Sequence, residues 1–252
     1  MRLIVPICIA ILALSSCQPT TTEPPGDNIE SVVDDYLAEW VGFYPSRALS
    51  AGQAEAASRL EDFGQSAVDG WLATNQRTLG RIRGLPEPTT LDERIDRQLL
   101  EGQIQRELFT WSEAEVHRTD PQTYSNLINH ALTAVLVRSN LSDEMKLDAA
   151  LERLGGLDRL SKTAKGQLGN GRPAATRASI RDIRSTAAFI EDGLVSALGV
   201  SDENPRRETL STRSARTAKA LNELADWIES DLETNLGDAY GEGLYARKLA
   251  LA

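Results

Sequence analysis

Few side chains in this sequence combine the types and spacing that metal binding or acid–base catalysis requires. Its two histidines are His117 and His130. A zinc site needs several ligands at fixed spacing, such as two histidines one helical turn apart, and neither histidine lies in such a motif. His117 lies among charged residues and is expected on the solvated surface. His130 is expected on a helix surface or half-buried, with one hydrogen-bond partner. We predict no metal-binding and no catalytic residue, unless folding brings carboxylates to these rings.

The carboxylates give no stronger signal for catalysis. They include adjacent pairs at Asp34/Asp35, Glu61/Asp62, Asp92/Glu93 and Asp202/Glu203. In an acidic helical protein most such pairs face solvent or cap helix starts. The sequence also lacks a Gly-x-Ser-x-Gly turn. The glycine-rich residues 166–171 lack the Lys-Ser/Thr ending of a phosphate-binding loop, so we interpret them as a connection between helices.

The N-terminus carries the most specific motif. Arg2 precedes an apolar run over residues 3–14, and Leu14-Ser15-Ser16-Cys17 follows. This pattern resembles the lipobox of bacterial lipoproteins. The resemblance implies cleavage before Cys17 and acyl chains, such as palmitate, on the cysteine. The apolar run is shorter than the roughly 20 residues of a spanning helix, which favours a signal peptide.

This lipobox implies a protein of the cell envelope, anchored by lipid on the periplasmic side. Gln18 differs from the Asp that retains some lipoproteins at the inner membrane, so the outer membrane is slightly favoured. Cys8 would leave with the signal peptide and Cys17 would be acylated. No thiol would then remain for a disulfide or a metal.

Composition restricts the partners. The chain contains 27 Lys+Arg and 37 Asp+Glu, with a net charge of −10. Nucleic acid is excluded as a partner, because binding phosphates requires a basic footprint. The same acidity leaves the acyl chains as the main attachment to the membrane. The charges are interspersed, which is typical of a solvated helical surface.

The remaining sequence predicts an all-α fold. Residues 17–27 are rich in Pro and Thr and are expected to be an unstructured tether after the lipidated cysteine. From residue 28 onward, apolar residues recur at three- and four-residue spacing, which indicates amphipathic helices. The stripes cover residues 29–41, 67–82, 95–109, 124–136, 145–168, 180–198 and 210–232. We predict an antiparallel multi-helix bundle of about seven or eight helices.

Local signals mark the helix ends. Asp27 or Asn28 can cap the first helix, and Ser142 or Asp143 a later one. Thr90-Leu91-Asp92-Glu93 is a capping-box pattern. Pro173 suits a first helical turn. Gly155-Gly156 is a predicted bend or break, and Trp111, near a helix end, is the aromatic residue expected to be exposed.

Four passages in this order are similar to the bacterial DUF885 family, and together they extend over nearly all of the mature chain. They are residues 33–40 with 44–48, residues 92–100, residues 120–127 with 151–154, and residues 241–249. The resemblance implies an all-helical zinc-peptidase relative, often a lipoprotein. It also implies a catalytic His-Glu-x-x-x-Gly-His motif in the C-terminal half of the family, and no residue here matches that motif.

We therefore expect three parts: a lipoprotein signal peptide (1–16), the lipidated Cys17 with its tether (17–27), and a truncated helical DUF885-like N-terminal domain (28–252). Such a chain would be non-catalytic alone, would bind no cofactor, and would meet zinc only if the missing half were supplied. One alternative is a self-sufficient helical scaffold lipoprotein that binds a peptide. Another is one half of a split metallopeptidase, with the C-terminal half as its partner.

Overall fold

The computed structural model describes residues 27–237 and 241–251. The predicted signal peptide, Cys17 and the tether before Asp27 lie outside the described residues, so the structure does not test them. Within the described part of the chain no residue lies in a strand. Eight of its helices have nine residues or more. The predicted all-α fold with seven or eight main helices is confirmed.

The helices are joined mostly by short connections. The longer ones are α1 (Ile29–Phe43), α3 (Gln65–Gly84), α4 (Leu91–Leu108), α6 (Gln122–Leu136), α7 (Asp143–Gln167), α8 (Pro173–Asp192), α10 (Arg207–Ser230) and α11 (Glu242–Ala250). The shorter ones are α2 (Pro45–Ser50), a 3₁₀ turn (Ala54–Ala56), a π turn (Phe109–Glu113), α5 (Val116–Thr119) and α9 (Leu194–Ala197).

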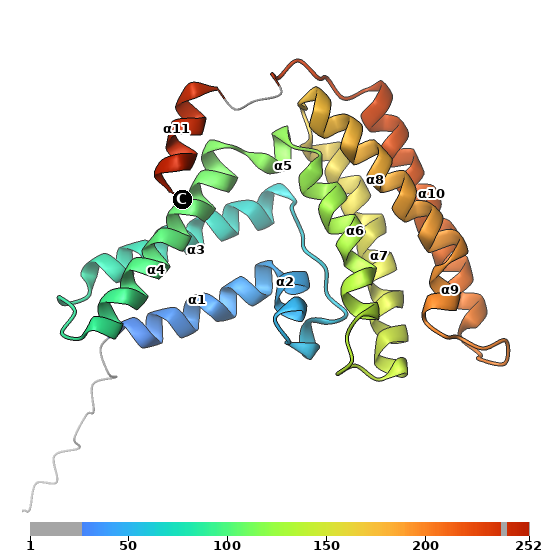
Figure 1. Ribbon diagram of the computed structural model, residues 1–252, viewed down its shortest axis with the longest axis horizontal. Coiled ribbons are helices and arrows are strands. Elements are labelled where there is room, and N and C mark those ends of the chain that lie inside the picture. The colour runs from blue at the N-terminus through green and yellow to red at the C-terminus, as the bar shows by residue number, and fades with distance from the viewer. Residues whose placement is uncertain (1–26, 238–240, 252) are drawn as a thin grey trace, which may run out of the picture.

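Two groups of helices form the molecule (Figure 1). Helices α6, α7, α8 and α10 form an up-and-down four-helix bundle, in which α6 and α10 each pack against both α7 and α8. Helices α1, α3 and α4 pack together as the second group. One apolar core contains residues of both groups, and α2 packs on α6. The segment from α2 to α3 therefore lies where the groups meet.

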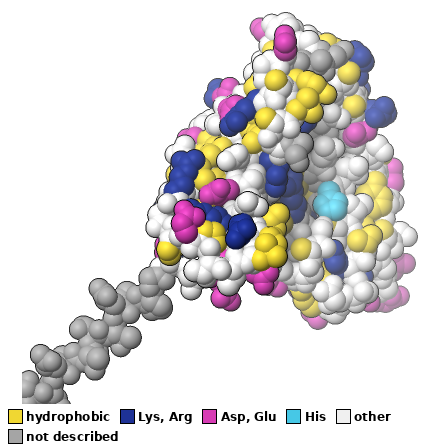
Figure 2. All heavy atoms as spheres, turned by 60° about the vertical axis from the view of Figure 1, so that its left-hand side comes forward, with side chains coloured by type: hydrophobic (Ala, Val, Ile, Leu, Met, Phe, Trp, Pro, Cys, Tyr) yellow, Lys and Arg dark blue, Asp and Glu magenta, His cyan; other side chains and the backbone are white. Residues whose placement is uncertain are grey.

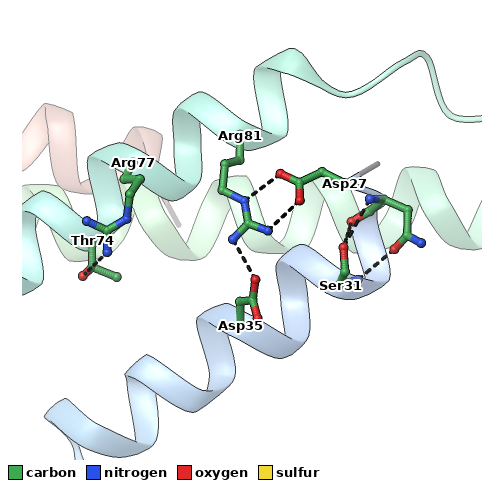
Figure 3. A network of polar contacts seen from close by, with 7 residues as sticks. Asp27, Ser31, Asp35, Thr74, Arg77 and Arg81 are labelled. Carbon is green, nitrogen blue, oxygen red and sulfur yellow. Dashed lines mark hydrogen bonds and ion pairs between the residues drawn. The ribbon is translucent and has the colours of Figure 1, made fainter. Parts of the chain in front are cut away.

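A cluster of ion pairs holds the start of α1 against α3 (Figure 3). Asn28 caps α1, and its side chain accepts a hydrogen bond from the Ser31 amide at 2.8 Å. Asp27 instead pairs with Arg81 of α3 at 2.8 Å, and Arg81 also contacts Asp35 at 2.9 Å. The hydrogen bond from Arg81 lowers the pKa of Asp27. Of the two predicted caps, Asn28 is the one used.

Other local predictions are also confirmed. Thr90 and Glu93 form the capping box of α4, Ser142 caps α7, and Pro173 lies in the first turn of α8. The predicted break at Gly155-Gly156 is wrong, because α7 is continuous there. A Cβ on Gly156 would lie 3.1 Å from Leu60 Cβ, so this glycine permits a close approach between α7 and the segment before α3.

Candidate functional site

A cleft of about 410 Å³ opens where the two helix groups meet. The face drawn in Figure 2 is hollowed between the groups, and basic side chains and a histidine lie along the hollow. The aromatic and aliphatic part of the lining comes from Tyr44, Phe63, Trp111, Val116 and Leu127. The polar part comes from Ser46, Arg47, Glu61, Thr110, Asp120, Thr123, Asn126 and His130. Mixed apolar and polar lining of this size is typical of a small-ligand site.

A buried arginine holds one wall of the cleft. Arg153 of α7 is completely buried. Its guanidinium donates to the carbonyl oxygens of Ala57 at 2.5 Å and Ala131 at 2.6 Å, and to Ser46 Oγ at 3.1 Å. Burial lowers its pKa to about 10, with Glu61 acting in the opposite direction, so it remains charged at neutral pH.

Ser46 connects this guanidinium to Glu61. The Glu61 side chain accepts the Ser46 amide at 3.0 Å and the Ser46 hydroxyl at 2.7 Å. Ser46 Oγ therefore donates to the carboxylate and accepts from Arg153. The network joins the start of α2, the segment before α3 and the middle of α7, so it fixes the wall from three parts of the chain.

A second buried carboxylate lies behind the aromatic side of the cleft. Glu107 Oε2 accepts hydrogen bonds from Tyr44 Oη at 2.6 Å, Trp71 Nε1 at 2.9 Å and Trp111 Nε1 at 3.1 Å. Its Oε1 accepts Gln103 Nε2 at 2.8 Å. Burial, and then the charge of Glu107, raise the pKa of Tyr44, which stays a neutral phenol. These four donors are all hydrogen-bonded to the Glu107 carboxylate, which therefore fixes the positions of the aromatic side chains along this wall.

Helix α6 presents its polar contribution along one face. Thr123, Asn126 and His130 follow at spacings of three and four residues, so they lie one above another toward the cleft. Arg47 of α2 lies on the cleft lining and is exposed, and its guanidinium stacks 4.4 Å above the Tyr44 ring. Arg47 has no ion-pair partner among the residues described. A free cation beside amide and hydroxyl groups suits an anionic group on a ligand.

Among the described residues, His130 of α6 makes one polar side-chain contact, with Ser50 of α2. Ser50 Oγ lies 3.0 Å from His130 Nε2 and donates its proton to the Ser46 carbonyl at 2.9 Å. A hydroxyl has one proton, so a hydrogen bond from His130 to Ser50 that forms together with the Ser50–Ser46 bond requires the tautomer with hydrogen on Nε2. In this state the imidazole has no lone pair directed at Ser50 with which to remove its proton.

Comparison with models of known protein families shows to which family the chain belongs. The model of the family described as "Bacterial protein of unknown function (DUF885)" matches residues 45–252. The chain belongs to the DUF885 family. The resemblance to this family seen in the sequence is confirmed. The matched region contains all of the residues that line the cleft except Tyr44.

A solved structure has the same fold as this DUF885 chain. It is described as "a putative lipoprotein of unknown function from Shewanella oneidensis" and superposes with a TM-score of 0.77 at 17% identity. The match covers 89% of this chain and 42% of the Shewanella chain, so the DUF885 chain spans less than half the length of that neighbour. The search of curated proteins gives no match.

The structure corrects the prediction for His117. This residue is only 2% exposed, and neither ring nitrogen has a hydrogen-bond partner among the described residues. Glu115, directly before α5, has a left-handed backbone with φ of 44° and ψ of 48°. The imidazole lies 5.8 Å from the Trp111 ring, between centroids. Burial, and then the charge of Arg118, lower the pKa of His117. His130 matches its prediction as an exposed residue with one partner.

Two further predictions fail because tertiary contacts override local sequence. Trp111 is 3% exposed, since the π turn directs its indole to Glu107. Glu61 is 7% exposed, although its pair with Asp62 suggested a solvated site. Sequence reasoning missed Arg153, Ser46 and Glu61 as a group, because they are far apart in the chain. A charged residue within the apolar stripe of α7 was the available signal for Arg153.

Metal ligands do not converge in the described part of the DUF885 chain, where no three His, Cys, Asp or Glu side chains form a group that could hold an ion. Cys17, the predicted lipidation site, lies outside the described residues. Among residues 27–237 and 241–251, no helix has both the length and the apolarity needed to cross a bilayer.

Proposed function

We propose that this chain is the ligand-binding helical part of an exported, lipid-anchored DUF885 protein, and that its cleft binds a peptide with a free carboxylate. The observation that carries the proposal is the cleft itself, in which Arg47 lies over the Tyr44 ring and has no ion-pair partner in the described part of the chain. The volume of about 410 Å³ accommodates two or three small residues. The walls are fixed by buried networks, so the site is pre-formed and loses little entropy on binding.

Each part of such a peptide has a matching group in the cleft. The carboxylate would pair with Arg47, with additional hydrogen bonds from Asn126 and Thr123. An aliphatic side chain would pack on Phe63 and Leu127. The Asp120 carboxylate lies in the same lining and would attract the peptide amino group.

We further propose that the chain alone does not hydrolyse its ligand. The family resemblance implies zinc-peptidase chemistry at a His-Glu-x-x-x-Gly-His motif, and this sequence contains no such motif. The Ser50 hydroxyl donates to the Ser46 carbonyl, so its proton is not directed at His130. The second candidate is that this helical part works together with a catalytic zinc-peptidase half, which the family resemblance implies.

Export and anchoring are proposed from the lipobox-like Leu14-Ser15-Ser16-Cys17, with the neighbour's description in support. The acyl chains on Cys17 would hold the protein at the periplasmic side of the cell envelope, with the outer membrane favoured. Mass spectrometry of the purified mature chain tests this directly. A triacylated N-terminal Cys17 is expected, and an unmodified or uncleaved N-terminus would contradict the anchor.

Calorimetric titration with the tripeptide Ala-Leu-Ala tests the binding proposal. Wild-type protein should bind the peptide with a free C-terminal carboxylate more tightly than the same peptide with a C-terminal amide. Arg47→Ala should weaken binding of the acid by about 10- to 100-fold, because a charge-assisted hydrogen bond contributes about 1.5–3 kcal/mol. The same variant should leave the amide nearly unchanged. Arg181→Ala is the matched control, since Arg181 is exposed and its ion-pair partner is its sequence neighbour Asp182. Equal affinities for acid and amide would refute the role of Arg47.

A further inference from the structure

Basic residues are concentrated in two stretches of this acidic chain. Residues 159–181 and 209–222 contain nine of the 27 Lys+Arg and none of the 37 Asp+Glu. The first stretch covers the second half of α7 and the first half of α8, and the second covers the middle of α10. The interspersed pattern expected from the sequence as a whole therefore does not hold in these two stretches, which carry positive charge only.

The structure brings the two stretches together as facing rows. Helices α7 and α10 pack side by side, and a hollow of about 270 Å³ runs between them. Lys162 and Lys165 line it from α7, and Arg216 and Lys219 line it from α10. We call these four side chains the basic groove. Arg159 lies one turn before Lys162 on the exposed surface of α7 and extends the row.

The carboxylates nearby leave the groove positive. Asp158 pairs with Arg216 at 3.0 Å and accepts the Thr217 hydroxyl at 2.8 Å, and Glu223 lies 3.9 Å from Lys219. Among the described residues, Lys162 and Lys165 have no ion-pair partner. Four cations against two carboxylates give a local charge of +2, in a chain whose total is −10.

We infer that the basic groove binds the phosphate headgroups of an anionic membrane surface and orients the protein on it. This inference rests on the proposed lipid anchor. Each lysine near an anionic leaflet strengthens attachment by about fivefold, a contribution that is weak for a free protein. An anchored protein meets the surface at a high effective concentration, so weak contacts are sufficient. The acyl chains hold the protein at the membrane, and the groove selects which side faces it.

Lysine labelling on vesicles tests the inference with the lipidated mature protein. The chain has five lysines, of which Lys162, Lys165 and Lys219 lie in the basic groove. Lys146 and Lys248 lie outside it and act as internal controls. The protein is bound to phosphatidylcholine vesicles with or without phosphatidylglycerol and is acetylated with a water-soluble reagent. Mass spectrometry then gives the rate at each lysine.

Phosphatidylglycerol should slow acetylation of the three groove lysines by about fivefold or more and leave both controls unchanged. Molar salt, which shortens the Debye length to about 3 Å, should abolish the protection. Replacing Lys162 and Lys219 together by Glu should remove the protection of Lys165. The pair Lys146→Glu and Lys248→Glu, with the same change in charge, should leave it intact.

Equal labelling on both kinds of vesicle would overturn the inference. Protection of the groove by soluble heparin without any protection by phosphatidylglycerol would also overturn it, and would point to an anionic polymer instead. Failure of the anchor has a separate signature, because an unacylated protein would not bind phosphatidylcholine vesicles at all.

Discussion

Replacing Arg153 by Met should destabilise the protein by about 3–5 kcal/mol. The guanidinium is completely buried and makes short hydrogen bonds to the carbonyls of Ala57 and Ala131 and one to Ser46 Oγ. A buried hydrogen bond to a charged group contributes about 1.5–3 kcal/mol, and leaving a buried carbonyl unpaired costs about 1–3 kcal/mol. The change also removes the positive charge that compensates Glu61, which is 7% exposed. Methionine replaces most of the apolar stem, so the loss reports on the charge and its hydrogen bonds.

Urea unfolding, followed by tryptophan fluorescence and circular dichroism, measures this difference. Arg181→Met is the matched control and should change stability by less than about 0.5 kcal/mol, because Arg181 is exposed. Arg153→Lys, which keeps the charge but loses the planar fork, should give an intermediate loss and remains measurable if Arg153→Met does not fold. In a double-mutant cycle, Glu61→Gln and Arg153→Met should couple by about 1–3 kcal/mol. A loss below 1 kcal/mol for Arg153→Met would refute the reasoning.

Three further substitutions test the interior and the packing of α7. The pKa of His117 is depressed by burial, so the unfolded chain takes up a proton more readily, and stability should fall as pH drops below about 6.5 toward the folded-state pKa. Urea midpoints between pH 8 and pH 5 should therefore decline less in His117→Phe than in wild type, and parallel profiles would contradict this. Gly155→Ala should stabilise α7 by about 0.5–1 kcal/mol, whereas Gly156→Ala, whose Cβ meets Leu60 at 3.1 Å, should be at least about 1 kcal/mol less stable than Gly155→Ala. Equal stability of the two alanine variants in thermal unfolding would show that Leu60 moves away freely.

The helices of this DUF885 protein were largely predictable because their signals are local. The capping box at Thr90 and Glu93, the cap at Ser142 and the proline at Pro173 each act within a few residues of the helix start. Apolar periodicity then identified the buried faces. These signals need no knowledge of the tertiary fold, so the all-α bundle followed from them.

The cleft was not predictable in the same way, because its residues meet only through tertiary packing. Arg153 and Ser46 are 107 positions apart and share a hydrogen bond. His117 has charged neighbours in sequence, yet the left-handed turn at Glu115 places its ring in the interior. Trp111 is near a helix end, but the π turn directs it toward Glu107. In each case a single backbone deviation or distant partner overrides the local pattern.

The central claim is that the cleft between the two helix groups binds a peptide carboxylate. Backbone amide spectra of ¹⁵N-labelled protein, recorded during titration with Ala-Leu-Ala, test it most directly. We predict saturable shifts concentrated at Arg47, Thr123, Asn126 and His130. In Arg47→Ala, the shifts at Thr123, Asn126 and His130 should need about 10- to 100-fold more peptide to reach half of their maximum. Saturable shifts located elsewhere, or no shifts at millimolar peptide, would contradict the claim.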